Sequence, residues 1–303
     1  MILLDGKSLF SKIKSDLCGE VQLMIDEGQR PPHLSAILVG ENPASETYVN
    51  AKIKACDEIG FKSSVFRYSN DVSEKQLLDK INEVNNSNEI DGLIVQLPLP
   101  KHIDEHLITH SIFPSKDVDG FHPVNIGRMV QGLSCFMPAT PFGIVSLLEE
   151  YDIETSGKKC LVIGRSNIVG TPISILLSRN KKIGNATVTL AHSKTQDLDS
   201  LTREADIIIV AIGVPQFLNA SMIKKNAIII DVGIHRVKSN KTKSGYKLVG
   251  DVNFDDVESK VSYITPVPGG VGPMTIASLL RNTLFSAKKI RFGNYSLLNP
   301  EHI

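Results

Sequence analysis

Apolar positions in the first third of the chain alternate between helical spacing and short continuous runs. Residues 7–28 carry apolar side chains at helical spacing and end at a glycine, whereas residues 34–39 form a continuous apolar run that is typical of a buried strand. The alternation continues through four more segments, which we expect to be a helix at 44–59, a strand at 62–68, a helix at 73–85 and a strand at 90–97. This β-α-β-α-β order predicts a parallel sheet with helices on both faces.

A second series of apolar runs follows a less regular stretch at 101–140. Thr140 and Pro141 have the residue types of a helix N-cap and of a first helical position, so we expect a helix to begin there. The strands expected after this helix lie at 159–163, 186–190, 207–211, 227–231 and 262–264. A lysine-rich segment at 238–247 indicates an exposed loop or hairpin, and a last helix is expected at 274–288. Two such series predict an α/β protein of two domains, each with a parallel sheet flanked by helices, and a cleft between them.

One turn in the second series has the pattern of a phosphate-binding loop. The apolar run 160–163 is followed by Gly164, Arg165 and Ser166, and a helical segment begins after Gly170, at 171–177. A strand, a glycine turn and a helix together bring backbone N–H groups to a helix N-terminus, where they bind phosphate. The pattern here is G-x-S-x-x-x-G instead of G-x-G-x-x-G, and an ordinary turn between a strand and a helix looks similar. This stretch alone leaves nucleotide binding open.

Composition and charge exclude several classes of function. The 303 residues include 33 Lys+Arg and 33 Asp+Glu, so no net field favours a nucleic acid or an anionic membrane. The N-terminus lacks the apolar region and cleavage site of a signal peptide, and no run approaches the ~20 apolar residues that cross a bilayer. The four cysteines are scattered without C-x-x-C spacing, which is typical of small buried side chains in a reducing compartment. We therefore expect a cytoplasmic protein that binds neither nucleic acid nor membrane.

The helix expected at 44–59 carries a tyrosine and a lysine that can act together. Tyr48 and Lys52 are spaced i, i+4, so a phenol and an ammonium share one face of the helix. An exposed pair on a solvated helix has the same spacing. Short-chain dehydrogenases also contain Tyr-x-x-x-Lys, but there the pair follows the nucleotide-binding turn, whereas here it precedes that turn by more than a hundred residues. The order argues against that family.

Two polar side chains lie where a ligand would meet the first sheet. Gln96 ends the apolar run 90–97, and ligands of open parallel sheets bind beyond the carboxyl ends of the strands. The carboxylate of Asp119 suits a flat heterocycle that presents an amino group beside a ring N–H, because it accepts two parallel hydrogen bonds. The alternatives are a strand-end amide that bonds the loop backbone and an Asp-Gly turn.

Three histidines with helical spacing raise the question of a metal site. His102, His106 and His110 are spaced i, i+4, i+8. Three histidines on one helix rarely close around zinc, and no H-E-x-x-H motif is present. We expect a polar surface stripe and no metal.

The segment after the second strand of the second series indicates which dinucleotide is bound. An acidic residue that grips the ribose of NAD would stand ~20 residues beyond the glycines. Ser193 and Lys194 stand there instead, and Arg165 adds a further positive charge. Hydroxyl and cationic donors suit a 2′-phosphate, so the sequence favours NADP over NAD.

These features, together with two more motifs, follow one another in the order of one family. The set comprises Tyr48-x-x-x-Lys52, the run from Asp91 to Pro100, Lys116-Asp117-Val118-Asp119-Gly120, Pro138-Ala139-Thr140-Pro141, Gly164-Arg165-Ser166-x-x-Val169-Gly170-x-Pro172, and the run from Thr265 to Thr275. From about Asp5 to Leu284 the chain closely resembles the bifunctional methylenetetrahydrofolate dehydrogenase/methenyltetrahydrofolate cyclohydrolase family. Residues departing from the family pattern are His235, where many members have asparagine, and Lys194, where arginine is often seen.

The resemblance implies two reactions on one folate: NADP-dependent oxidation of 5,10-methylenetetrahydrofolate to the methenyl cation, then hydrolysis to 10-formyltetrahydrofolate. It implies that Lys52 activates water and transfers protons, that Tyr48 positions the folate and that Gln96 bonds Lys52. Substrate-binding residues implied in the same way are Asp119, Pro268, Gly269 and Gly270. Cofactor-binding residues implied in the same way are Gly164, Arg165, Ser166, Val169, Gly170, Ser193, Ile234 and Thr275.

The resemblance also implies how the chain is divided and assembled. We expect a folate-binding catalytic domain at 1–139, a Rossmann-type NADP-binding domain at 140–275 and a C-terminal helix within 276–303 that packs back on the first domain. We expect a homodimer. Two other classes share parts of this pattern: a two-domain NAD(P) oxidoreductase of the amino-acid or shikimate dehydrogenase type, and a non-catalytic nucleotide-binding protein. Neither requires Tyr48, Lys52 and Gln96 together.

Overall fold

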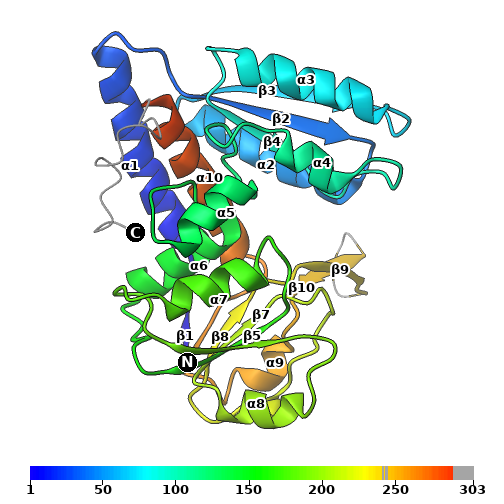
Figure 1. The fold of residues 1–303 in the computed structure, drawn as a ribbon. Helices are drawn as coiled ribbons and strands as arrows, with labels where there is room; N and C mark the ends of the chain where they lie inside the picture. The colour runs from blue at the N-terminus through cyan, green and yellow to red at the C-terminus, as the bar shows by residue number, and fades with distance from the viewer. Residues whose placement is uncertain (241, 243–244, 289–303) are drawn as a thin grey trace. The chain divides into compact units, whose positions relative to one another are not determined.

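The computed structural model describes residues 1–240, 242 and 245–288, and the chain divides into two compact units (Figure 1). The three-stranded unit contains Ser11–Ala139 and the last helix from Ile276 onward, and the six-stranded unit contains Met1–Phe10 and Thr140–Thr275. The first ten residues are thus grouped with 140–275, whereas we expected them in one domain with the rest of 1–139.

The first ten residues are grouped with the six-stranded unit because a two-residue strand at the N-terminus pairs with its sheet. Strand β1 (Ile2–Leu3) pairs in parallel with β11 (Tyr263–Ile264), which lies at the far end of the chain. The backbone N–H of Ile2 donates to Ser262 O at 2.8 Å, and that of Leu4 donates to Ile264 O at 2.9 Å. The chain then leaves this sheet and enters helix α1 (Gly6–Asp26).

The three-stranded unit is built on a parallel sheet with the strand order β3-β2-β4. Its strands are β2 (His33–Val39), β3 (Lys62–Tyr68) and β4 (Gly92–Val95). All seven residues of the central strand β2 are buried, as the continuous apolar run predicts. One face of the sheet packs on α3 (Glu74–Asn86) and α4 (Glu105–His110), and α2 (Pro43–Glu58) packs on β2 and β3.

The helices of this unit begin at side-chain caps. Ser73 and Gln76 form the capping box that the sequence suggests: Gln76 N donates to Ser73 Oγ at 3.3 Å, and Ser73 N donates to Gln76 Oε1 at 3.0 Å. The irregular stretch 101–140 contains two short helices that the pattern did not reveal, α4 and α5 (Pro123–Val130), which are capped by Asp104 and His122.

The six-stranded unit has a wholly parallel sheet with the order β1-β11-β8-β7-β5-β6. The strands not yet given are β5 (Lys159–Ile163), β6 (Thr187–Ala191), β7 (Ile207–Val210) and β8 (Ile228–Asp231). The helices between them are α6 (Ala139–Glu150), α7 (Gly170–Ser178), α8 (Leu198–Glu204), α9 (Phe254–Val257) and the short 3₁₀ helix η1 (Ala220–Met222). Strand β5 pairs with β6 on one side and β7 on the other, so the order reverses at β5; dinucleotides bind at such switch points.

One expectation about this unit is wrong and another is confirmed. Helix α6 begins at Ala139, two residues before the expected first helical position Pro141, so Thr140 is not its N-cap. The Thr140 hydroxyl instead shares a 3.0 Å hydrogen bond with that of Thr275. The lysine-rich segment belongs to an antiparallel hairpin of β9 (His235–Lys238) and β10 (Tyr246–Val249), although residues 241, 243 and 244 lie outside the described residues.

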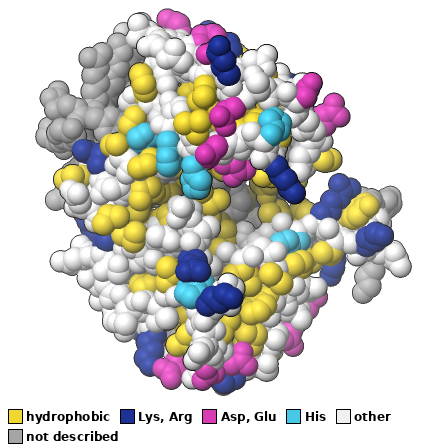
Figure 2. Space-filling model, turned by 45° about the vertical axis from the view of Figure 1, so that its right-hand side comes forward, with side chains coloured by type: hydrophobic (Ala, Val, Ile, Leu, Met, Phe, Trp, Pro, Cys, Tyr) yellow, Lys and Arg dark blue, Asp and Glu magenta, His cyan; other side chains and the backbone are white. Residues whose placement is uncertain are grey.

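The last helix, α10 (Val271–Ala287), contains the boundary between the units, which falls after Thr275. The part expected beyond residue 288 lies outside the described residues. On the face drawn in Figure 2, Lys and Arg side chains are interspersed with Asp, Glu and hydrophobic ones, in keeping with the equal numbers of acidic and basic residues. None of the helices in the described part of the chain combines the length and apolar character that a membrane crossing requires.

Candidate active site

The pair Tyr48 and Lys52 lies on a helix whose start is well defined. Asn42 caps α2 by accepting the N–H groups of Ala44 at 2.9 Å and Ser45 at 3.3 Å, and Pro43 occupies the first turn. Lys52 is only 8% exposed, and Tyr48 is half-buried. Burial raises the pKa of the Tyr48 phenol, so it remains protonated and able to donate. The alternative of an exposed pair on a solvated helix is therefore wrong for Lys52.

Gln96 is the hydrogen-bond acceptor of the buried lysine. It lies directly after β4, with its backbone N–H donating to Ile37 O at 2.9 Å. Its side-chain N–H donates to Leu97 O at 2.8 Å, which turns the amide oxygen toward Lys52 Nζ at 3.4 Å. Within the described residues this is the one hydrogen bond of the ammonium, which has three N–H donors. A buried lysine with a neutral, distant acceptor has donors left for a ligand.

Asp119 is an electrostatic neighbour of the same lysine. Burial raises the pKa of the Asp119 carboxyl, and the charge of Lys52 acts in the opposite direction. The two groups are therefore close enough to influence each other. Gly120 follows at φ +75°, and a Cβ there would lie 2.6 Å from the backbone of Met137 and Pro138. The Asp-Gly dipeptide thus makes a turn, and that turn presents Asp119 beside Lys52.

Asp117 holds this turn in place from inside the unit. Its carboxylate accepts N–H groups from Phe121 at 3.1 Å, from His122 at 2.7 Å and from the Asn125 side chain at 2.8 Å. Burial raises the pKa of Asp117 to about 7, although these three donors lower it. In the sequence Asp117 is only one residue of the Lys116–Gly120 motif, because its supporting role depends on contacts within the folded loop.

Asn282 is a second supporting residue that the sequence did not reveal. It lies in α10, where its amide donates to Val118 O at 2.8 Å and to Met137 O at 3.0 Å. The acceptors flank the Asp119-Gly120 turn and a neighbouring segment, so one amide joins both to the helix. A polar residue inside an apolar helix was the only available signal.

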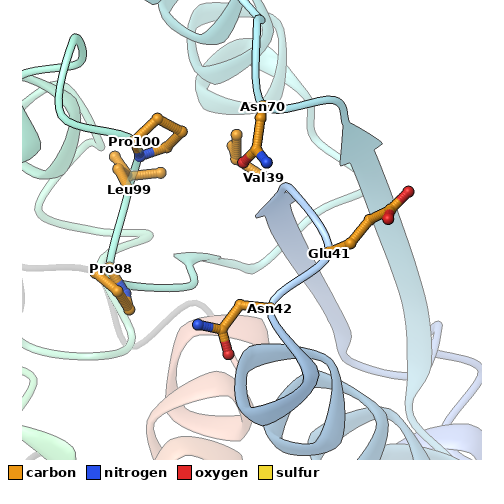
Figure 3. A pocket seen from close by; sticks show the side chains of 7 residues that line it. All are labelled: Val39, Glu41, Asn42, Asn70, Pro98, Leu99 and Pro100. Carbon is orange, nitrogen blue, oxygen red and sulfur yellow. The ribbon is translucent and has the colours of Figure 1, made fainter.

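A pocket of about 380 Å³ lies at the carboxyl ends of all three strands of this unit (Figure 3). It is lined by Val39, Glu41, Asn42, Asn70, Pro98, Leu99 and Pro100. Figure 3 shows the three residues from the segment after β4 on one side and Val39, Asn42 and Asn70 on the other, while the Glu41 side chain points away. Pro98 follows Gln96 by two residues and Asn42 caps α2, but none of Tyr48, Lys52, Gln96 and Asp119 is among the residues that line this pocket.

The glycine turn after β5 is a close-packed loop in the six-stranded unit. A Cβ at Gly170 would lie 1.8 Å from Gly164 O, and a Cβ at Gly164, which has φ +114°, would lie 2.2 Å from Ala211 O. Ser166 accepts the N–H groups of Val169 at 3.2 Å and Gly170 at 3.4 Å through its hydroxyl. The serine that departs from the usual glycine pattern therefore stabilises the start of α7.

The other residues expected to bind the cofactor lie on loops of the same unit. Ser193 and Lys194 are exposed in a turn after β6, in which His192 N donates to Thr195 Oγ1 at 2.9 Å. Arg165 is exposed after the adjacent strand β5. Ile234 is 42% exposed, and Thr275 is half-buried with its hydroxyl bonded to Thr140. Hydroxyl and cationic groups at the ends of neighbouring strands fit an anionic nucleotide.

The glycine loop expected to border the substrate also belongs to the six-stranded unit. Pro268, Gly269 and Gly270 lie between β11 and α10, and Gly269 O accepts the N–H of Lys7 at 2.9 Å. A Cβ at Gly6 would lie 1.9 Å from Gly270 O, so α1 can begin here only with a glycine. The proposed substrate residues are thus divided between the two units, with Asp119 in the three-stranded one.

The histidines do not form the expected stripe. His106 and His110 lie on α4, with ring centroids 5.7 Å apart, but His102 precedes the helix and its Nε2 bonds Val72 O at 2.9 Å. Across residues 1–240, 242 and 245–288, no group of three or more His, Cys, Asp or Glu side chains is arranged to hold a metal ion.

Two family models match the two parts of the chain. Residues 4–119 match the catalytic domain, and residues 138–291 the NAD(P)-binding domain, of tetrahydrofolate dehydrogenase/cyclohydrolase. A protein of Cytophaga hutchinsonii named bifunctional protein FolD is 57% identical over 95% of this chain and 99% of its own. The one from Bacteroides thetaiotaomicron is 55% identical over 95% and 99%.

Two solved structures have a fold similar to that of this chain. The bifunctional enzyme FolD from Campylobacter jejuni, a methylenetetrahydrofolate dehydrogenase/cyclohydrolase, has a TM-score of 0.89 and 50% identity and covers 95% of this chain and 99% of its own. The Trypanosoma brucei enzyme, solved with NADP cofactor and an inhibitor, has a TM-score of 0.90 and 36% identity over 95% and 98%.

Proposed function

The chain belongs to the tetrahydrofolate dehydrogenase/cyclohydrolase family, and from this premise we propose which of its residues perform the two reactions. In the first, 5,10-methylenetetrahydrofolate is oxidised to the methenyl cation with NADP+. In the second, water converts the methenyl cation to 10-formyltetrahydrofolate. The observation that carries the assignment is the buried Lys52, held 3.4 Å from the neutral oxygen of Gln96 and beside Asp119. Neither a non-catalytic nucleotide-binding protein nor an amino-acid or shikimate dehydrogenase requires this group.

The dehydrogenase step demands orientation more than acid–base chemistry. Bound NADP+ supplies the acceptor for the hydride that leaves the methylene carbon. Asp119 accepts two parallel hydrogen bonds from the amino group and ring N–H of the pterin, and Tyr48 lies one helical turn from Lys52, where its phenol positions the folate. The Pro268–Gly270 loop borders the folate. The reacting carbon is then held in one place, and the barrier falls because orientation is already fixed.

The cyclohydrolase step requires proton transfer. As the oxygen of water bonds to the methenyl carbon, Lys52 accepts the proton that the water loses. The bond between this carbon and one ring nitrogen then breaks: the nitrogen takes up the proton that Lys52 returns, and the hydroxyl on the carbon releases its own proton to solvent as it becomes the formyl carbonyl. A lysine in water titrates near 10.4, so a lysine base near neutrality needs ~4 kcal/mol of differential interaction. Gln96 meets this amine with a neutral oxygen, which adds no negative charge that would hold the proton on it.

The fit of the six-stranded unit to NADP rests on two features. The turn of Gly164, Ser166 and Gly170, with Val169 at its end, lies at the switch point of the sheet and presents the N-terminus of α7 to a pyrophosphate. Arg165, Ser193 and Lys194 offer donors and positive charge for a 2′-phosphate. Ile234 and Thr275 complete the set that we assign to the cofactor.

Two further proposals concern the state of the protein. We propose a homodimer, as the family resemblance implies; sedimentation equilibrium at micromolar concentration would show twice the 33.1 kDa chain mass, whereas a monomer would contradict it. We also propose that the protein works in the cytoplasm, since its four cysteines are scattered along the chain without C-x-x-C spacing, as is typical of proteins in a reducing compartment.

The first experiment supplies 5,10-methylenetetrahydrofolate with NADP+ and then with NAD+, and follows the absorbance of reduced cofactor and of the methenyl product. Turnover with NADP+ is expected to be the faster. Absence of turnover with both cofactors would refute the proposed function.

The residue assignment is tested by Lys52→Ala with Lys54→Ala as its control. Lys54 is on the same helix, but its side chain is 79% exposed and forms an ion pair with Glu58 at 3.9 Å. We expect Lys52→Ala to lose cyclohydrolase activity by at least about a hundredfold, the usual contribution of a general base, and dehydrogenase activity by much less. Lys54→Ala should match the unsubstituted enzyme in both assays. Equal losses of both activities in Lys52→Ala would remove Lys52 from its proposed role.

A further inference from the structure

Beside the proposed cofactor site lie two buried carboxylates whose positions depend on each other. Asp231 ends β8, and Asp251 follows the hairpin of β9 and β10; both are at most 3% exposed. A Cβ at Gly233 would lie 2.3 Å from Asp251 Oδ1, and a Cβ at Gly250 would lie 1.8 Å from Asp231 Oδ2. Each carboxylate therefore occupies the space that a glycine of the other segment leaves free.

Asp231 fixes the position of Asp251. Its carboxylate accepts the backbone N–H groups of Gly233 at 3.0 Å, of Asp251 at 2.9 Å and of Val252 at 3.0 Å. These bonds join the segment after β8 to the segment after β10. The side chain of Asp251 is thereby directed toward the carboxyl end of the neighbouring strand β7.

Asp251 in turn holds the loop after β7. Its Oδ2 atom accepts the N–H groups of Ile212 at 2.8 Å and Gly213 at 3.0 Å, and its Oδ1 atom lies 2.7 Å from His235 Nε2. The preceding residue of this loop, Ala211, is the one whose carbonyl packs against Gly164. The carboxylate therefore connects His235 to the glycine turn through one short loop.

His235 is the side-chain donor in this arrangement. It is the first residue of β9 and directly follows Ile234, which we assign to the cofactor site. Its imidazole is 19% exposed, and its bond to a fully buried carboxylate compensates a charge that would otherwise lie in an apolar environment. Without this donor, Asp251 would keep two N–H partners and lose the third, so its side chain and the loop that it holds would be free to shift.

We propose that His235 is a positioning residue for the NADP site: through Asp251 it holds the Ile212–Gly213 loop against the glycine turn, and through the chain it holds Ile234. The inference rests on the proposed function, because it assumes that the glycine turn binds the dinucleotide. His235 makes no contact with reacting atoms in this scheme. Its loss should therefore weaken cofactor binding without slowing the reaction of the bound cofactor.

The test compares His235→Ala with His235→Gln and with Lys238→Ala. A glutamine amide can place a neutral N–H donor near the position of His235 Nε2. Lys238 is exposed at the other end of β9 and does not reach Asp251, so its substitution controls for general weakening of the hairpin. NADP+ affinity is measured by titration calorimetry on each folded protein, and KM and kcat are measured at saturating folate.

We expect His235→Ala to raise the dissociation constant and the KM of NADP+ about tenfold, with kcat within about twofold of the unsubstituted enzyme. His235→Gln should recover most of the affinity, and Lys238→Ala should not change it. An unchanged dissociation constant in His235→Ala, or a His235→Gln variant as weak as His235→Ala, would overturn the inference. If the unsubstituted protein binds no NADP+, the proposed function fails, which is a separate outcome.

Discussion

At the scale of single residues, the proposed chemistry depends on the charge of the group that faces Lys52. Gln96 offers an amide oxygen at 3.4 Å and turns its N–H group away, toward Leu97 O. A neutral acceptor orients the lysine without favouring its ammonium form as a carboxylate would. A charge introduced at position 96 should therefore shift the pH at which hydrolysis proceeds.

Replacing Gln96 by glutamate tests this dependence. A carboxylate within ~4–6 Å stabilises a cation by the equivalent of about one to three pH units. The lysine would then lose its proton only at higher pH. We therefore expect the pH–rate profile of the cyclohydrolase to move to higher pH by about one to three units. The dehydrogenase profile should move less, because hydride transfer needs no base. The measurement is kcat/KM of both activities between pH 6 and 10.

A second substitution separates charge from shape. Gln96→Met keeps a side chain of similar length but removes the acceptor, so its activity should fall without an alkaline shift. If Gln96→Glu leaves the pH–rate profile of the cyclohydrolase unchanged, the group whose deprotonation that reaction requires is not Lys52.

At the scale of elements, the turn between β5 and α7 has a serine, Ser166, where the usual pattern has its second glycine, and this serine has a structural role. The Ser166 hydroxyl accepts two N–H groups of the turn, and the two glycines provide space for backbone oxygens. Gly170 is therefore required by packing against Gly164, whichever nucleotide is bound.

We predict that Gly170→Ala loses NADP+ affinity by at least about tenfold. The added Cβ would lie 1.8 Å from Gly164 O, so the turn must open and its N–H groups must move. Gly19→Ala is the control, since this glycine lies inside α1 with nothing within 4 Å of a Cβ, and alanine there should stabilise the protein by about 1 kcal/mol. Unchanged NADP+ binding by Gly170→Ala in calorimetry would show that the turn does not hold the dinucleotide.

Long elements with a clear period could be predicted from the sequence, and features set by distant contacts could not. Strands β2 and β5 and helices α2 and α3 follow from apolar spacing and end signals. Strand β1 has only two residues, too few for a period, and α4 and α5 are short helices that begin at side-chain caps.

Some residues of the candidate site could likewise be predicted from the sequence, and others could not. Tyr48, Lys52 and Gln96 follow from spacing and strand ends. Asn282 does not, because its two acceptors lie 164 and 145 residues away in the chain. The interlocked carboxylates Asp231 and Asp251 likewise become visible only when the fold brings the ends of β7 and β8 and the β9–β10 hairpin together.

At the scale of the whole molecule, each unit contains a buried carboxyl with a raised pKa. Burial raises the pKa of Asp117 in the three-stranded unit to about 7, and it raises that of Asp231 in the six-stranded unit to about 7. Both are at most 3% exposed, and both accept three N–H groups, which act in the opposite direction. An unfolded aspartate titrates near 3.9.

The two units should therefore lose stability as the pH rises from about 4 to about 7. In this window the folded protein holds protons that the unfolded chain has released, so the free energy of unfolding falls with increasing pH, and above about 7 these groups contribute no further slope. The contribution is at most about 4 kcal/mol for each carboxyl. The measurement is the urea midpoint between pH 5 and 8, with Asp117→Asn and Asp231→Asn compared with the unsubstituted protein.

Each variant removes one titrating group, so each should unfold with a flatter pH dependence than the unsubstituted protein. Each should also be less stable overall, because an amide N–H would then face backbone N–H donors. The difference in slope isolates these carboxyls from the exposed acids, which are common to all three proteins. A variant slope equal to that of the unsubstituted protein would mean that the N–H donors outweigh burial and keep both carboxylates ionised throughout the window.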